Sequence, residues 1–106
     1  METIAIELSA ATLVNVLTCD PGDQAGLLKL LRENIDTVIS ALDGWRSTIL
    51  VASPDGARVI IISQWRDADA ITSMQNNARM QAYFPKIAAL AAFDSTPGVI
   101  SYTCQA

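Results

Sequence analysis

Two short segments of consecutive apolar, largely β-branched residues restrict the fold of this chain more than any other feature. They are Ile49-Leu50-Val51 and Val59-Ile60-Ile61-Ile62. β-Branched residues favour strands, and successive side chains of a strand point to opposite faces of the sheet. An antiparallel sheet with one wet face would instead alternate apolar and polar residues. The sequence therefore predicts strands that are apolar on both faces.

Turn-forming residues separate four strand-like segments. Their β-branched and apolar composition predicts strands over residues 12–19, 45–52, 57–65 and 99–104. Ser53-Pro54-Asp55-Gly56 lies between the second and third segments and is typical of a hairpin turn. Ser95-Thr96-Pro97-Gly98 predicts a further turn directly before the last strand.

Two helical regions are expected between these strands. The first is predicted to start with Asp20 as its N-cap and Pro21 at its first helical position. Apolar residues then follow at helical spacing from Leu27 to Leu42, and Gly44 is expected to end the run. This helix should therefore pack one apolar face against the sheet.

The second helical region is predicted to start with Asp67 as its cap and to extend to about residue 90. Asn76-Asn77 indicates a break within it, and Pro85 indicates a kink or a restart. The element order is thus strand, helix, strand, strand, helix, strand. With right-handed crossovers, it predicts one α+β domain over residues 1–106, a ferredoxin-like four-stranded antiparallel sheet with both helices on one face.

The second face of such a sheet needs a cover, because the helices can shield only one face. A second copy of the same sheet is the cover that we expect, which predicts a homodimer built as a dimeric α+β barrel. The alternative is that the strands are short and that the second face is apolar through composition alone.

Composition excludes several classes of function. The formal net charge of −4 and the isoelectric point near 4.4 argue against a nucleic-acid partner, which clustered basic residues would bind. The chain contains no histidine, which argues against most zinc enzymes, histidine-dependent hydrolases and histidine-ligated haem proteins. No apolar run reaches the length of a membrane span. We therefore expect a cytoplasmic protein that binds neither nucleic acid nor membrane.

The two cysteines, Cys19 and Cys104, are too few for a metal site or a disulfide scaffold. They are expected at the ends of the first and last strands, which would be adjacent and antiparallel. Their Cα atoms should therefore lie farther apart than the roughly 7 Å that a disulfide allows. No bond between them within one chain is predicted.

Two residues of the predicted strands are candidates for a functional site. Asn15 lies inside the apolar first strand, where a buried amide must find hydrogen-bond partners. Trp65 ends the third strand, and its indole nitrogen is a lone donor that could serve a bound oxygen atom. From spacing alone an ordinary structural role is favoured for both, with Asn15 bonded to backbone and Trp65 in the core.

The second helical region adds candidates for substrate binding. Arg79 and Tyr83 are four residues apart and are expected on one helix face, with Met80 and Phe84 close by. A guanidinium there could hold an enolate or a phenolate. The ordinary alternative is that Arg79 is a solvated helix charge.

Several segments together resemble one known family, the antibiotic biosynthesis monooxygenases. The likeness spans nearly the whole chain. The later helical run resembles the branch of that family that oxidises aromatic polyketides, the tetracenomycin-type and anthrone oxygenases. The segments that carry the resemblance are Val14-Asn15-Val16, Asp20-Pro21-Gly22, Gly44-Trp45, Ser53-Pro54-Asp55-Gly56-Ala57-Arg58-Val59, Ser63-Gln64-Trp65 and Ala78-Arg79-Met80-Gln81-Ala82-Tyr83-Phe84-Pro85.

The resemblance implies a dimeric α+β barrel and an oxygenase that needs no cofactor and uses dioxygen to convert an aromatic substrate, a polycyclic phenol or anthrone, to a quinone. It also implies that Asn15 and Trp65 line the pocket and donate hydrogen bonds to the developing anion. Arg79 would favour the ionised substrate. Some anthrone oxygenases carry an asparagine and a tyrosine at the positions of Ile61 and Ile71, so the agent of proton transfer is not identified.

Two other functions remain open at this point. The chain could be a small-molecule-binding barrel without catalytic activity, or an oxygenase of a smaller quinol. Haem-degrading relatives bind iron through a histidine on the second helical region. The absence of histidine makes that activity a poor fit.

Overall fold

The sheet has four antiparallel strands in the order β2-β3-β1-β4. The structure is a computed structural model and describes residues 10–106. The strands are β1 (Ala11–Cys19), β2 (Trp45–Ala52), β3 (Arg58–Trp65) and β4 (Ala91–Val99). The predicted α+β, ferredoxin-like fold is confirmed. β1 and β3 form the centre, and β2 and β4 are the edges.

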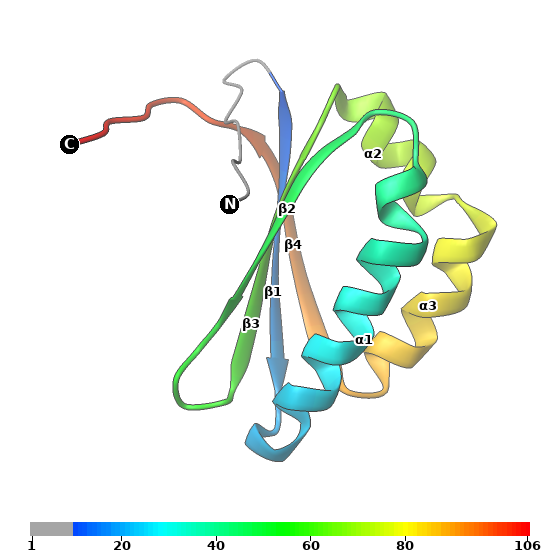
Figure 1. Cartoon of the computed structure of the whole chain (residues 1–106), viewed down its shortest axis with the longest axis vertical. Helices are drawn as coiled ribbons and strands as arrows, with labels where there is room; N and C mark the ends of the chain where they lie inside the picture. The colour runs from blue at the N-terminus through cyan, green and yellow to red at the C-terminus, as the bar shows by residue number, and fades with distance from the viewer. Residues whose placement is uncertain (1–9) are drawn as a thin grey trace.

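Within residues 10–106, three α-helices cover one face of this sheet (Figure 1). They are α1 (Gln24–Thr37), α2 (Ala68–Gln75) and α3 (Ala78–Ala88). α1 packs through Leu27 and Leu31, which are almost completely buried against Leu17 and Val59 of the central strands. The apolar spacing of the sequence therefore places the α1 face against the sheet as predicted.

The first helix starts and ends differently from the prediction. Asp20 occupies the N-cap position and Pro21 the first position, as predicted, but of a short 3-10 turn, η1 (Pro21–Asp23), that precedes α1. The Asp20 side chain makes no capping hydrogen bond. α1 ends at Thr37, and a second 3-10 turn, η2 (Ile39–Ala41), follows it. Gly44 comes after both, in a turn with φ of +86°, a conformation that glycine adopts without strain.

The break at Asn76-Asn77 lies where it was predicted, between α2 and α3. The Asp67 carboxylate accepts a hydrogen bond from the Ala70 N–H and caps α2, also as predicted. Asn77 caps α3, because its side-chain oxygen accepts hydrogen bonds from the N–H groups of Arg79 and Met80. Pro85 lies within α3 and does not start a new helix.

The last strand was predicted at the wrong place. Residues 99–104 were expected to form it, with a turn at residues 95–98, but β4 ends at Val99 and includes Ser95 and Pro97. β4 is an edge strand, paired on one side with β1, and an edge strand tolerates a proline that lacks an N–H. The correction matters, because it places Ser95 directly opposite Asn15 of β1.

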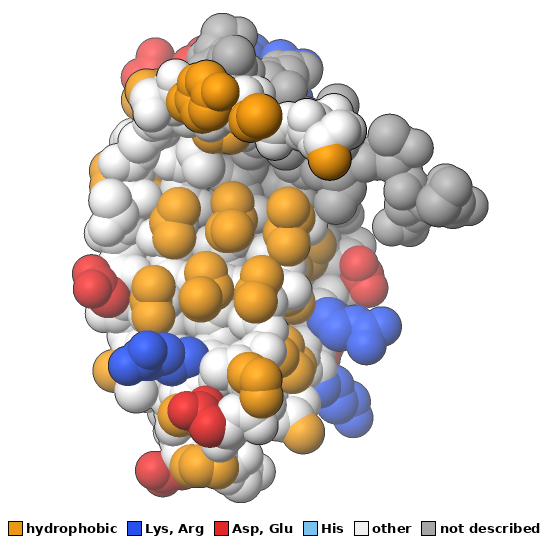
Figure 2. All heavy atoms as spheres, turned by 90° about the vertical axis from the view of Figure 1, so that its left-hand side faces the viewer, with side chains coloured by type: hydrophobic (Ala, Val, Ile, Leu, Met, Phe, Trp, Pro, Cys, Tyr) orange, Lys and Arg blue, Asp and Glu red, His pale blue; other side chains and the backbone are white. Residues whose placement is uncertain are grey.

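The face of the sheet opposite the helices is apolar, as the consecutive aliphatic residues predicted. The pairing register places two rows of branched aliphatic side chains there, each row crossing three strands. Figure 2 shows this block as hydrophobic side chains gathered on the surface. We call it the outer face, defined by Val14, Val16, Ile49, Val51, Ile60 and Ile62.

Cys19 and Cys104 are both free in the structure. Cys19 is half-buried at the end of β1, but Cys104 is exposed and lies beyond β4. It is therefore not at a strand end, as had been expected. Within residues 10–106, no helix has the length and apolar composition that crossing a membrane requires.

Candidate functional site

A pocket of about 510 Å³ lies between the sheet and the helices, with walls formed by β1, β3, β4, α1 and α3 together with parts of β2 and α2. Its size falls in the range of pockets that enclose drug-sized ligands. Among the described residues that line it, none has a charged side chain. A ligand would therefore meet an apolar wall with a few uncharged polar groups.

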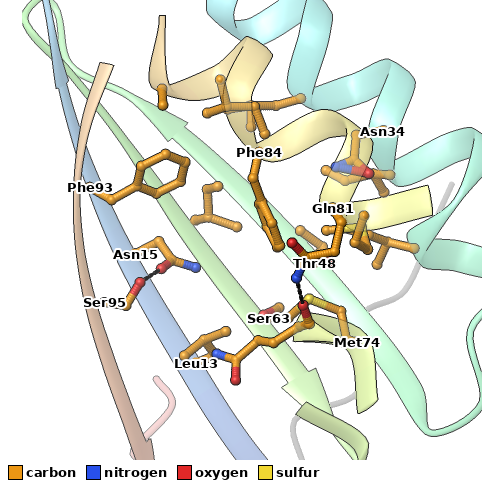
Figure 3. Close-up of a pocket in the computed structure, with 18 of the residues that line it drawn as sticks. Leu13, Asn15, Asn34, Thr48, Ser63, Met74, Gln81, Phe84, Phe93 and Ser95 are labelled. Carbon is orange, nitrogen blue, oxygen red and sulfur yellow. Dashed lines mark hydrogen bonds between the residues drawn. The ribbon is translucent and has the colours of Figure 1, made fainter. Parts of the chain in front are cut away.

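Asn15 contributes its amide to the sheet side of the pocket. The hydroxyl of Ser95 on β4 donates a hydrogen bond to the Asn15 Oδ1 atom. This bond occupies the carbonyl, so the Nδ2 group of Asn15 turns away from Ser95 toward the pocket interior (Figure 3). The amide thus presents N–H donors to a ligand.

Trp65 lies at the pocket wall but is only 1% exposed, within the core cluster formed with Leu13 and Met74. Its indole N–H donates to the hydroxyl of Ser63, with 3.0 Å between nitrogen and oxygen. The indole has one N–H and Ser63 receives it in the structure, so a direct bond from Trp65 to a ligand would require this contact to break. The hydroxyl of Ser63, which also lines the pocket, stands in its place.

Arg79 and Tyr83, which the sequence suggested as substrate-binding residues, make hydrogen bonds to α1. Arg79 is exposed, and its Nη2 donates to the Thr37 carbonyl at the end of α1, 3.1 Å away. The Tyr83 hydroxyl donates to the Glu33 carboxylate at 3.1 Å. Both side chains join α3 to α1, and both lie outside the set of described residues that line the pocket.

Met80 and Phe84, the other two residues suggested for substrate binding, line the pocket. Met80 is buried and Phe84 is half-buried against the same cluster as Trp65. Figure 3 shows Phe84 directed from α3 into the space above the sheet. Phe93 of β4 adds a second ring to the lining. A flat aromatic ligand would find apolar contacts on these side chains.

Sequence reasoning missed several polar groups of the site: Asn34, Thr48, Ser63 and Ser95. Asn34 on α1 is only 2% exposed, and its Oδ1 atom has no hydrogen-bond partner in the structure. Buried polar atoms without a partner are rare in folded proteins. The polar break in an otherwise apolar helix face was the signal that could have identified Asn34.

Among the described residues, the carboxyl groups whose pKa is shifted are Asp55, in a turn, and Asp67, at the start of a helix. Hydrogen bonds from the Ala57 N–H and then from the Ser53 hydroxyl lower the pKa of Asp55 in the β2–β3 turn. The Ala70 N–H and then Arg66 lower the pKa of Asp67 at the start of α2. The two lowered pKa values result from hydrogen bonds and charges within the turn and the helix start. Neither carboxyl group lines the pocket, whose described lining has no ionisable side chain.

The fold and the pocket together define a small α+β protein with a pocket of largely apolar lining, which carries no charged side chain among the described residues. The family profile of the antibiotic biosynthesis monooxygenases matches residues 10–86, and the chain belongs to this family. Comparison with curated protein sequences gives no match.

Solved structures with the same fold include two Streptomyces oxygenases. A variant of SnoaB, a cofactor-independent oxygenase from Streptomyces nogalater, is 18% identical with a TM-score of 0.82, covering 90% of this chain and 96% of that one. A monooxygenase from Streptomyces coelicolor in complex with nanaomycin D is 18% identical with a TM-score of 0.83, covering 92% and 93%. Rv0793 from Mycobacterium tuberculosis is 22% identical with a TM-score of 0.71, covering 92% and 99%. At these identities the likeness shows the fold alone.

Proposed function

We propose that this chain is a cofactor-independent monooxygenase that oxidises a polycyclic phenol or an anthrone to a quinone with dioxygen. The observation that carries the proposal is the pocket. It is large, apolar and uncharged in its described lining, and it holds an oriented amide donor, Asn15, on its sheet side. The family and the two Streptomyces oxygenases of the same fold support the reaction class.

The reaction can proceed on the electrons of the substrate. An anthrone loses a proton from its central carbon to give an enolate, and the enolate transfers one electron to dioxygen. The two radicals combine to a peroxide anion, which takes a proton back from water to become a hydroperoxide. The hydroperoxide then loses water, as its carbon gives up the remaining hydrogen, and a carbonyl group is left. One oxygen atom thus enters the product and the other leaves as water. Because no described lining residue is ionisable, the proton is released to water.

The protein contributes binding, orientation and stabilisation of charge. Met80, Phe84 and Phe93 line the pocket and would contact the rings of the substrate, while the open side of the pocket lets water reach the reactive carbon and take up its proton. Asn15 donates to the oxygen atom that gains negative charge, and Ser95 fixes the amide for that task. In this proposal Trp65 shapes the pocket wall. The distant Arg79 does not contact the substrate.

Oxygen uptake with an anthrone, in the presence of a metal chelator, tests the proposal. The protein should consume oxygen well above the rate of spontaneous anthrone oxidation and should form the quinone in equal amount. Asn15→Ala should lower turnover on the order of a hundredfold, as removal of one preorganised donor does elsewhere. Thr18→Ala, a change on the exposed side of the same strand, is the matched control.

A panel of polycyclic and single-ring phenols separates the proposal from its alternatives. Oxidation of single-ring quinols alone would indicate an oxygenase of smaller substrates. Saturable binding of the polycyclic ligands without any oxygen uptake would contradict the proposed reaction. It would indicate instead a protein that binds small molecules without oxidising them.

We also propose that the protein is a homodimer in which two outer faces pack against each other. The outer face is a block of aliphatic side chains without a cover from the described chain, and Val51 within it is 44% exposed. Exposed apolar surface of this kind marks an interaction site.

A further inference from the structure

The two tryptophans of the chain make the same unusual contact. The indole N–H of Trp45 donates to the Thr48 hydroxyl at 2.9 Å, and that of Trp65 donates to the Ser63 hydroxyl at 3.0 Å. Both hydroxyl groups belong to residues that line the pocket. An indole can only donate, so each hydroxyl oxygen is the acceptor and keeps its own proton available for a further bond.

These two hydroxyl groups lie next to each other and close to Asn15. Thr48 of β2 faces Ser63 of β3 in the pairing register. Asn15 faces Ile61, so it is the diagonal neighbour of Ser63 on β1. All three side chains point to the helix side of the sheet, where cross-strand neighbours have Cβ atoms about 4.5–5.5 Å apart and diagonal neighbours somewhat farther apart. They form a polar row across three strands, in which Thr48 and Ser63 are directly opposite each other and Asn15 is diagonal to Ser63, beside Leu13.

Each side chain in this row accepts a hydrogen bond through its oxygen atom, so its own O–H or N–H group remains available to donate. Trp45 and Trp65 occupy lone pairs of the two hydroxyl groups, and Ser95 occupies the Asn15 carbonyl. The structure assigns no acceptor among residues 10–106 to the hydroxyl protons of Thr48 and Ser63. Figure 3 shows the Asn15 amide nitrogen directed away from Ser95. The row therefore presents hydrogen-bond donors to the pocket.

We propose that Thr48, Ser63 and Asn15 form a donor row that binds the negatively charged oxygen of a phenolate or enolate ligand. The choice of ligand class rests on the proposed function, while the geometry of the donors does not. A ligand oxygen with negative charge accepts several bonds at once, and bonds to a charged group are stronger than bonds between neutral groups. The described lining holds no cation, so uncharged donors must offset the cost of burying that charge.

Trp65 acts in this arrangement through Ser63. Its ring fills the core, and its N–H holds the serine oxygen so that the hydroxyl proton points toward the ligand. Chains of hydrogen bonds also polarise one another, which makes the serine a better donor. Trp65 is thus a positioning residue, and Ser63 is the group that contacts the ligand.

A titration of bound β-naphthol under argon tests the donor row without any turnover. The naphtholate has its own absorption band, so the ratio of naphtholate to naphthol is measured directly at a fixed pH. Ser63→Ala should lower that ratio in the bound state on the order of tenfold, the effect of losing one hydrogen bond to a charged oxygen. Thr48→Val should lower it in the same direction. Ser63→Thr, which keeps the hydroxyl, should restore most of it.

The double variant decides the role of Trp65. Trp65→Phe alone should lower the naphtholate ratio, because Ser63 loses the bond that orients it. In the Ser63→Ala background the same change should alter the ratio less than about twofold, since the effects of coupled residues do not add. An undiminished effect in that background would show that the indole contacts the ligand directly and would overturn the positioning role.

Ser73→Ala is the matched control, since Ser73 is an exposed serine on α2. It should leave the naphtholate ratio unchanged. An equal ratio in the parent protein and Ser63→Ala, or no saturable binding of β-naphthol, would overturn the donor row. A protein that shifts the naphthol equilibrium as predicted but consumes no oxygen with an anthrone would contradict the proposed reaction alone.

Discussion

Asn34 carries a cost in stability that its replacement should reveal. Its side chain is 2% exposed on α1, and its Oδ1 atom has no hydrogen-bond partner. Asn34→Leu keeps the branched shape and the number of side-chain heavy atoms, and the pocket beside it has room for the larger methyl groups. The change removes the unpaired carbonyl, so the free energy of unfolding should rise by about 1 kcal/mol. Thermal unfolding followed by circular dichroism measures the change, which should raise Tm by several degrees.

A smaller side chain at the same position provides the control. Asn34→Ala removes the same carbonyl but leaves an unfilled space, so its gain in stability should be smaller than that of Asn34→Leu. A loss of stability in Asn34→Leu would contradict the view that this amide is unpaired in the free protein.

Residue by residue, the sequence could predict the apolar part of the site better than its polar part. Met80 and Phe84 were expected close to Arg79 and Tyr83, and they line the pocket. Arg79 and Tyr83 precede them by one residue each, and one residue is about 100° of rotation around a helix. That rotation turns both toward α1, where they bind Thr37 and Glu33.

The hydroxyl groups of the donor row could not be predicted from spacing. Serine and threonine occur in many strands without any special role, and their local sequence contains no signal for a partner. Ser63 gains its role from the Trp65 indole, and Ser95 gains its role from β1, its neighbouring strand. Only the register of the sheet brings Ser95, far along the chain, to Asn15.

At the scale of elements, β4 shows why the last strand was missed. Its sequence includes Asp94-Ser95-Thr96-Pro97-Gly98, residue types that favour turns. Tertiary pairing overrides that preference, because β1 has an open edge and β4 supplies the backbone partners for nine residue pairs. The central strands were predicted well, since their aliphatic composition agrees with their burial.

The start of α2 should make stability depend on pH in acid. The Ala70 N–H and then Arg66 hold the pKa of Asp67 below its ordinary value of 3.8. A carboxyl whose pKa is lower in the folded state stabilises that state above its unfolded pKa, and the contribution disappears as pH falls through the folded value. Below about pH 4, the stability that Asp67 contributes should therefore decline.

Asp67→Asn tests this dependence, because the amide keeps a capping oxygen but has no charge to lose. At neutral pH the parent protein should be the more stable of the two, and the difference in Tm should shrink on acidification below about pH 4. Asp69→Asn removes a charge from the same turn and leaves the cap intact, so it serves as the control. A Tm difference that is constant across the acid range would contradict the role of the Asp67 charge.

For the whole molecule, the sheet has two apolar faces with different tasks. The helix-facing side forms the core and the pocket, with Leu17 and Val59 fully buried. The outer face has the same kind of side chains without a cover from the described chain (Figure 2). The edges of the outer face are polar, with Thr18 opposite Arg58 on one side and Asp94 opposite Val16 on the other. An apolar centre with a polar rim is the usual anatomy of a protein–protein interface.

The dimer proposal predicts a specific response to a charge at the centre of the outer face. Ile62 lies between Ile49 and Val14 in the register, so a carboxylate there would be buried between two sheets without a partner. Ile62→Glu should therefore dissociate the protein into monomers at micromolar concentration, whereas Thr18→Glu at the rim should leave it dimeric. Sedimentation velocity distinguishes the 11.3 kDa chain from its dimer. A parent protein that sediments as a stable monomer would contradict the proposed dimer. An Ile62→Glu variant that remains dimeric would contradict an interface at the outer face and place it elsewhere on the molecule.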